Sequence, residues 1–388
     1  MSILLQDYQL LRIPGPTPIP PSVQQAMMKP MTGHREQDTK DLLKRVQPRL
    51  KKVFGTDEDV VIIAGSGTSG LEAAVVNTVA AGDEVLVIVT GSFGERFTEI
   101  CKAYHLHVHT LHYEWGKALI PEEVASVLAA NPSIKAVFAT YCETSTGVIN
   151  PIEELAATIK QSSEALVIID GVSCVGAVET KLDEWGIDIC VTGSQKALML
   201  PPGLCFIAAS KKAWNIIETN QQPRFYLDLR KYHHTSLEFS TPFTPALSLL
   251  YGLEQSLSLL ESEGLSQVYR RHQMMKQMTR AAFKSLGIPL LTTDMFASPT
   301  VTAILPDDVK PDALRKVLKQ DFGIVLAGGQ SKLKEKIFRI GHMGYCTPAD
   351  ILQIISCIEI GLYKIGTIQE TGFGVMAAQQ AYLQEEGI

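Results

Sequence analysis

The sequence predicts an α/β protein with a large domain, built on a mostly parallel sheet between helices, and a smaller C-terminal α/β domain. Three observations support this prediction. Between residues 60 and 208, short apolar runs alternate with stretches of helical spacing. The runs are continuously apolar and rich in β-branched residues, as are strands buried on both faces of a parallel sheet. A length of 388 residues, of which 46% are hydrophobic and 20% charged, gives room for two folded domains.

An extended arm is predicted for residues 1–35, because its closely spaced prolines are incompatible with a helix or an inner strand. Such an arm either links two elements or lies across a groove as a lid. Ser22 is then predicted to cap a short helix, Val23–Met28. A second helix is predicted over Asp38–Val53, and Pro48 should kink or divide it.

The large domain follows, over residues 36–262. Its predicted strands are Val60–Ala64, Glu84–Val89, Ile134–Thr140, Ala165–Ile169, Ile187–Val191 and Leu204–Ala208. Its predicted helices include Ser69–Ala81, Phe93–Tyr104, Pro121–Ala130 and Ile152–Ser162. Ligands of parallel sheets bind beyond the carboxyl ends of the strands. Polar residues follow five of these strands, so we expect one site along this edge.

The alternation stops after Leu204–Ala208. Residues 209–245 are polar, aromatic and punctuated by prolines, and are predicted to form a loop with a functional or interface role. The small domain is predicted over residues 263–388. The remaining predicted elements are the helices Pro245–Glu261, Leu265–Leu286, Pro311–Gln320 and Pro348–Ile365 and the strands Thr300–Leu305 and Lys336–Ile340.

Composition narrows the class of protein. The net charge is −6 and no long basic block occurs, so nucleic acid is not expected as a partner. No signal peptide is recognisable, and no apolar run approaches the length of a membrane span. The seven cysteines are scattered without a CxxC motif, which indicates reduced thiols and a cytoplasmic protein.

A glycine-rich turn, Gly65–Gly70, follows the first strand and opens a helix. Free backbone N–H groups at the helix start, together with the hydroxyl groups of Ser66 and Thr68, would form a cradle for one phosphate. The turn has neither the Walker A pattern nor dinucleotide spacing. A plain tight turn with a capped helix explains it equally well.

Two ionisable residues end later strands. Asp170 follows Ala165–Ile169, where it could pair with a protonated ring nitrogen or simply cap the next turn. Lys196 follows the strand Ile187–Val191 among small and apolar residues. Burial would lower the pKa of the Lys196 amine and leave a fraction of it uncharged for Schiff-base chemistry. The alternative is a solvated lysine in a loop, which would keep its ordinary pKa. A phosphate cradle, a strand-end Asp and a buried Lys, in this order, describe a pyridoxal 5'-phosphate (PLP) site.

At this point the chain resembles the class V, fold-type I PLP-dependent aminotransferases, and among them the alanine/serine–glyoxylate group. The matching stretches span nearly the whole chain: Pro14–Thr17, Gly33–Arg35, Gly65–Thr68, Glu143–Gly147, Asp170–Val172, Thr192–Lys196, Tyr232–Thr235 and Phe338–Gly341.

The resemblance implies a role for each matching residue. Lys196 would hold PLP as a Schiff base and act as general base, and Asp170 would fix the pyridinium proton. The phosphate ligands would be Ser66, Gly67, Thr68 and Gln195. Ser145 would lie near the ring hydroxyl of the cofactor. Phe93 occupies the position where the family stacks an aromatic residue, often Trp, on the pyridine ring.

Two further roles concern the substrate and the partner subunit. Arg339 would bind the substrate α-carboxylate in bidentate fashion, although a structural strand arginine is the alternative. Tyr232 and Thr235 would reach the cofactor phosphate of the neighbouring subunit, which implies a homodimer with composite active sites.

The implied activity transfers an amine from alanine or serine to glyoxylate by a ping-pong mechanism. Ureidoglycine and aminoethylphosphonate are alternative donors in the same framework. A cysteine desulfurase is a second alternative, but it would carry His before the Schiff-base Lys, where Gln195 stands, and a Cys ahead of Arg339, whereas residues 310–338 contain none. A non-catalytic accessory subunit is a third.

Two motifs are left without a functional role. His105, His107, His109 and His112 resemble a metal cluster, but an edge strand with solvent-facing histidines explains them better, and no metal is predicted. The stretch Gly328–Lys332 resembles a phosphate loop without a helix cap, and we expect a mobile segment near the substrate entrance.

Overall fold

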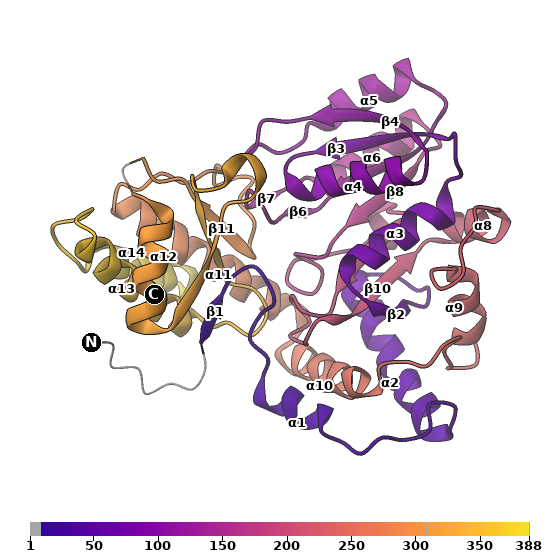
Figure 1. Cartoon of the computed structure of the whole chain (residues 1–388), viewed down its shortest axis with the longest axis horizontal. Coiled ribbons are helices and arrows are strands. Elements are labelled where there is room, and N and C mark those ends of the chain that lie inside the picture. Colours follow the sequence, from indigo (N-terminus) through magenta and orange to yellow (C-terminus); the bar gives the residue numbers. More distant parts are fainter. Residues whose placement is uncertain (1–8, 308, 388) are drawn as a thin grey trace.

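The computed structural model describes residues 9–307 and 309–387. Figure 1 shows a larger lobe around a seven-stranded sheet and a smaller lobe that carries a four-stranded sheet and the C-terminal helices. The predicted α/β architecture with a smaller C-terminal unit is confirmed.

The seven-stranded sheet has the order β2-β10-β9-β8-β5-β3-β4. Its strands are β2 (Val61–Gly65), β3 (Glu84–Val89), β4 (His107–His112), β5 (Ile134–Thr140), β8 (Leu166–Asp170), β9 (Ile189–Gly193) and β10 (Gly203–Ala209). Only β10 runs against its neighbours. The carboxyl ends of the other six strands therefore meet at one edge of the sheet.

Helices cover both faces of this sheet. They are α2 (Gln37–Phe54), α3 (Gly67–Thr78), α4 (Ser92–Ala103), α5 (Pro121–Ala130), α6 (Ile152–Ser162), α7 (Leu182–Trp185), α8 (Lys211–Thr219) and α10 (Leu247–Glu263). Successive residues of β3 pack into two different clusters, one beneath α3 and α4 and the other beneath α5 and α6. This two-sided burial explains why the inner strands β3, β5, β8 and β9 are mostly apolar.

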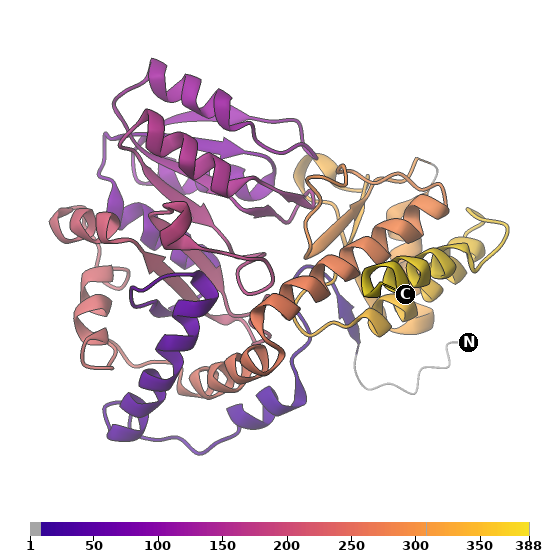
Figure 2. The same cartoon turned by 180° about the vertical axis from the view of Figure 1, so that it is seen from behind.

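The smaller lobe contains a mixed sheet of order β1-β12-β13-β11. Its elements are β1 (Leu10–Arg12), β11 (Val301–Ile304), β12 (Ile324–Gly328), β13 (Phe338–Gly341), α11 (Leu265–Ser285), α12 (Pro311–Phe322), η1 (Ser331–Leu333), α13 (Pro348–Lys364) and α14 (Phe373–Glu386). Figure 2 shows the long helix α11 running into this lobe, where it packs against α13 and α14. Because β1 pairs with β12, part of the predicted arm is an edge strand of the smaller sheet. The domain boundaries themselves remain predictions.

The structure corrects several expected elements. Residues 209–245 are not a loop, because they contain α8 and α9 (Leu229–Ser236). Ser210 and Asp228 cap these helices, and both are residue types that favour the N-cap position, so the sequence did carry a signal for these helices. Pro48 does not divide α2, since burial of Val46 and Leu50 on either side keeps the helix continuous.

Three smaller elements also differ. The short helix α1 (Pro21–Met27) begins with a proline at its first position, so Ser22 lies inside it. β12 was not predicted, because it owes its place to pairing with β1 and β13. The 3₁₀ helix η1, which begins at Ser331 after Gly328 ends β12, was not predicted. The mobility expected of this stretch stays a prediction.

The histidine-rich segment forms β4, an edge strand as predicted. His107 and His112 are exposed, and His109 Nε2 lies 2.8 Å from a carboxylate oxygen of Glu84. Within residues 9–307 and 309–387, no group of three or more His, Cys, Asp or Glu residues could hold a metal ion. In the same ranges no helix combines the length and apolar character needed to cross a bilayer.

Candidate active site

The candidate site lies along the carboxyl edge of the seven-stranded sheet. Ser66 follows β2, Ser92 follows β3, Asp170 ends β8 and Lys196 follows β9. The turn around Thr144 follows β5 and connects β6 (Cys142–Glu143) with β7 (Val148–Ile149). The prediction that polar residues from five strands share one edge is confirmed.

Lys196 is buried in a tight turn between β9 and β10. Ser194 fixes this turn by donating to the carbonyl of Pro201 and accepting from the Leu204 N–H. Lys196 is 8% exposed, and its Nζ donates to Ser173 Oγ over 3.2 Å. Burial lowers the pKa of the amine to about 8, although the nearby Cys142 and Asp170 oppose this shift. The amine is therefore partly uncharged near neutral pH.

The N-terminal arm lies directly over this lysine. The Thr17 hydroxyl donates to the Lys196 carbonyl over 3.0 Å, and the Thr17 N–H donates to the Gln195 carbonyl. A methyl group added to Gly15 would come within 2.6 Å of Lys196 Cδ and 3.0 Å of its Nζ. Of the two roles considered for the arm, this packing favours the lid.

Asp170 is buried at the end of β8. One carboxylate oxygen accepts the Val172 N–H over 2.9 Å, so the residue does cap the following turn. Burial raises the pKa of Asp170 to about 6, whereas this hydrogen bond and the cations of Lys196 and Arg96 oppose the rise. Its second oxygen has no hydrogen-bond partner among the described residues and is free to bind a cationic N–H.

An anion cradle lies between β2 and α3. Ser66 is the N-cap of α3 and accepts the Ser69 N–H. The first turn leaves the N–H groups of Gly67 and Thr68 without helical partners. The Gln195 side chain lies beside this turn, where its amide NH2 group could donate to an anion, and its Oε1 atom is buried without a hydrogen-bond partner among the described residues. A methyl group on Gly193 would lie 2.9 Å from that oxygen and 3.6 Å from the Gly67 nitrogen, so the cradle depends on a glycine there.

The turn Glu143–Thr144–Ser145 connects the two lobes at the site. The Thr144 hydroxyl makes a short hydrogen bond with Ser173, the partner of Lys196. The Thr144 carbonyl accepts from Arg339 Nη1 over 2.8 Å. Ser145 donates to the Glu143 carboxylate and accepts the Ser92 N–H. A chain of hydrogen bonds thus runs from Lys196 to Arg339.

Arg339 projects from β13 and is 4% exposed. Its Nε and Nη2 atoms both donate to the Gly328 carbonyl, at 3.0 and 2.8 Å. Burial lowers the pKa of the guanidinium to about 10, and the nearby Glu143 opposes the shift. No carboxylate of the described residues lies within ion-pair distance. A buried cation with free N–H groups and no acidic partner is suited to bind an incoming carboxylate.

Phe93 lies in the first turn of α4, and Arg96 covers its ring with the guanidinium carbon 4.7 Å from the ring centroid. Arg96 also acts electrostatically on Asp170 and Lys196. Sequence reasoning missed Arg96, Ser173 and Gly15 as parts of this site. A signal existed for Arg96, because residues three apart on a helix share a face.

Tyr232 and Thr235 are not brought to Lys196 in the single chain. The Thr235 hydroxyl donates to the carbonyls of Lys231 and Tyr232 in its own helix. The Tyr232 hydroxyl is buried and has no hydrogen-bond partner within residues 9–307 and 309–387. The Tyr232 ring centroid lies 5.9 Å from that of Phe243. The role of both residues in a neighbouring subunit remains a prediction.

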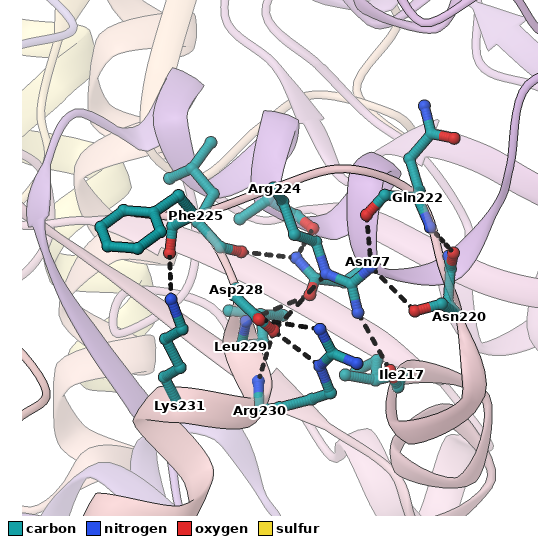
Figure 3. A network of polar contacts seen from close by, with 12 residues as sticks. Asn77, Ile217, Asn220, Gln222, Arg224, Phe225, Asp228, Leu229, Arg230 and Lys231 are labelled. Atoms are coloured by element: carbon teal, nitrogen blue, oxygen red, sulfur yellow. Dashed lines mark hydrogen bonds and ion pairs between the residues drawn. The ribbon is translucent and has the colours of Figure 1, made fainter.

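The segment that precedes α9 is held by a buried polar network (Figure 3). Asp228 accepts two hydrogen bonds from the Arg230 guanidinium at 2.8 Å and lies 3.5 Å from Arg224 Nε. Asn77 of α3 donates to the Leu227 carbonyl and accepts the Leu229 N–H. The segment is therefore tied to the larger lobe although it carries exposed aromatic residues.

The chain is similar to known proteins along nearly its whole length. The profile of the family described as "Aminotransferase class-V" matches residues 10–353. The chain is 42% identical over 380 residues to a "Soluble hydrogenase, small subunit" of Synechococcus, covering 97% of this chain and 99% of that protein. It is 37% identical to the serine–glyoxylate aminotransferase of Methylorubrum extorquens, covering 97% and 96%. The crystal structure of ureidoglycine–glyoxylate aminotransferase from Bacillus subtilis superimposes with a TM-score of 0.90 at 29% identity, covering 98% and 100%.

Proposed function

Because the chain belongs to the class V aminotransferase family and has the fold of its solved members, we propose that it is a PLP-dependent aminotransferase. It moves the amino group of a small L-amino acid, alanine or serine, to glyoxylate by a ping-pong mechanism. The observation that carries the proposal is the buried Lys196 amine of lowered pKa, set on the same sheet edge as Asp170 and an anion cradle. Members of this family typically bind PLP.

The described residues fit this cofactor. The N–H groups of Gly67 and Thr68, with the Ser66 hydroxyl and the Gln195 side chain, would hold a phosphate in the cradle. The unpartnered oxygen of Asp170 would accept a ring N–H. Phe93 would cover one face of the ring. When bound, PLP supplies the electron sink that aminotransferase chemistry needs.

The chain's own groups supply binding and proton transfer. Lys196 would hold the cofactor and, once released, carry the proton to and from the substrate Cα, because its lowered pKa allows the amine to act as a base near neutral pH. Arg339 would orient the substrate through its carboxylate.

The identity of the amino donor is the most specific part of the proposal. Similarity to the serine–glyoxylate aminotransferase of Methylorubrum extorquens supports serine as the amino donor, and similarity to the Bacillus subtilis structure supports ureidoglycine as the alternative donor.

The seven unbridged cysteines, six of them buried, support a cytoplasmic location.

A homodimer with composite sites is also part of the proposal. Phe225 and Leu237, which flank α9, are 71% and 68% exposed. A second subunit packed against α9 and its flanks would cover both side chains. The oligomeric state in solution tests this part independently of activity.

The visible absorbance spectrum of the purified protein tests the proposal. The protein should be yellow, lose this colour with L-serine or L-alanine and regain it with glyoxylate. The variant Lys196→Ala should fail to complete the cycle. A protein that remains colourless after incubation with PLP would contradict the assignment of Lys196.

A second candidate comes from the Synechococcus relative, whose name is that of a hydrogenase subunit. An accessory role would need none of the site chemistry. The isolated chain separates the two candidates: amino-group transfer by the purified protein, abolished in Lys196→Ala, favours the enzyme. A protein inert toward all amino donors that co-purifies with a second enzyme favours the accessory role.

A further inference from the structure

Glu143 is a fully buried carboxylate to which the proposed chemistry gives no role. It ends β6, whose pairing with β7 fixes its backbone. One of its oxygens accepts the N–H groups of Phe93 and Gly94, at 3.1 and 3.2 Å. The other accepts the Ser145 N–H over 3.1 Å and the Ser145 hydroxyl. Four donors thus converge on one carboxylate.

These contacts replace a missing helix cap. The N-cap position of α4 is Gly91, which has no side chain to accept the first N–H groups of the helix. Glu143 accepts those of Phe93 and Gly94, and Ser145 accepts that of Ser92. A methyl group on Gly91 would come within 2.5 Å of Glu143 Cδ, so this glycine leaves the space that the carboxylate fills.

The charge of the carboxylate suits this position. Burial raises the pKa of Glu143 to about 7, and its hydrogen bonds with Ser145 and Gly94 oppose the rise. All four neighbouring groups donate hydrogen bonds, and the ionised carboxylate accepts them together. The positive end of the α4 dipole stabilises the same charge. Phe93 is therefore held twice, at its backbone by Glu143 and at its ring by Arg96.

We propose that Glu143 is a positioning residue. Its carboxylate fixes the first turn of α4, so that the Phe93 ring and the Ser145 hydroxyl lie in position to contact the cofactor. The inference rests on the proposed function and adds to it a residue that touches neither substrate nor cofactor. It acts through the backbone of Phe93, about 50 residues earlier in the chain.

The first test needs no cofactor. In Glu143→Gln, an NH2 group, which cannot accept a hydrogen bond, replaces one of the two carboxylate oxygens, so the acceptors for the four donors are halved. We expect the backbone amides of Phe93 and Gly94 to exchange hydrogen about tenfold to hundredfold faster than in the wild type. Glu99→Gln, which changes an exposed carboxylate of the same helix, should leave these rates unchanged. Unchanged exchange in Glu143→Gln would overturn the proposal.

The second test asks whether Glu143 acts through Phe93. In otherwise wild-type protein, Glu143→Gln should weaken PLP binding about tenfold and alter the visible circular dichroism of the bound cofactor. In a Phe93→Ala background the same change should weaken binding less than threefold, because its target is gone. An equal effect in both backgrounds would place the action of Glu143 elsewhere and refute the proposal.

A third variant protects the test from misfolding. Glu143→Asp keeps the charge but shortens the side chain, so it should accelerate the same two amides by a smaller factor. Failure of the wild type to bind PLP would contradict the proposed function, and the exchange rates would still decide the role of Glu143 in fixing α4.

Discussion

Replacing Gly15 with alanine tests whether the N-terminal arm sets the position of the Lys196 amine, the proposed catalytic group. The added methyl would lie 2.6 Å from Lys196 Cδ, 2.7 Å from its Cε and 3.0 Å from its Nζ. Ordinary carbon–carbon contacts are about 3.5 to 4.0 Å, so the lysine side chain or the arm must move by roughly 1 Å. A misplacement of about 1 Å in a catalytic group can lower the rate roughly 100-fold.

The assay is the single-turnover rate with L-serine or L-alanine, followed by the loss of absorbance of the bound cofactor. We expect Gly15→Ala to retain cofactor and lower this rate by about 10- to 100-fold. Gly287→Ala is the matched control, because its φ of +67° also disfavours alanine although nothing lies within 4 Å of the added methyl. The control should lose some stability, about 1 kcal/mol, but no rate. Equal rates in Gly15→Ala and the wild type would refute the idea that the arm positions Lys196.

Three further predictions follow from the same structure. Because burial lowers the pKa of Lys196 to about 8, the rate at which cofactor-free protein combines with PLP should rise with pH and reach half its maximum near pH 8; a rate that is flat between pH 6 and 9 would contradict this. Arg339→Lys should raise KM for glyoxylate about 10- to 100-fold in steady-state assays and leave PLP binding unchanged, whereas Arg315→Lys, the control, should change neither. Burial lowers the pKa of His272 to about 3, so through this residue the native state loses about 1.4 kcal/mol of stability for each pH unit below 6.5. Urea unfolding at pH 7 and pH 5 should show that His272→Gln loses less stability at the lower pH than the wild type. The control His112→Gln, at an exposed position, should lose as much as the wild type.

The sign of the last prediction follows from proton binding. His272 is uncharged in the folded protein because its ring is buried, with Nδ1 next to the Val268 carbonyl and Nε2 accepting the Gly344 N–H. In the unfolded chain it takes up a proton near pH 6.5. The unfolded state therefore binds more protons between pH 6.5 and 3, and stability falls as the pH falls through that window.

The fold could be predicted because its cause is local and repeated. Each inner strand of the large sheet is a short apolar run, since both of its faces are buried, and each helix between the runs shows its own spacing. Predicted elements fail where pairing or capping decides them. β12 depends on two partners from distant parts of the chain, and α9 depends on the cap of Asp228 within a polar segment.

The site, like the fold, has parts that the sequence predicts and parts that depend on tertiary contacts. Parallel strands bring their carboxyl ends to one edge whatever their order, so the sequence alone was sufficient to group Ser66, Asp170 and Lys196. Only the tertiary structure could show that Gly15 lies on Lys196, that Glu143 caps α4 and that no described carboxylate pairs with Arg339. Burial and hydrogen bonding join residues that are far apart in the chain, whereas the spacing of residue types records only which face of an element each one occupies.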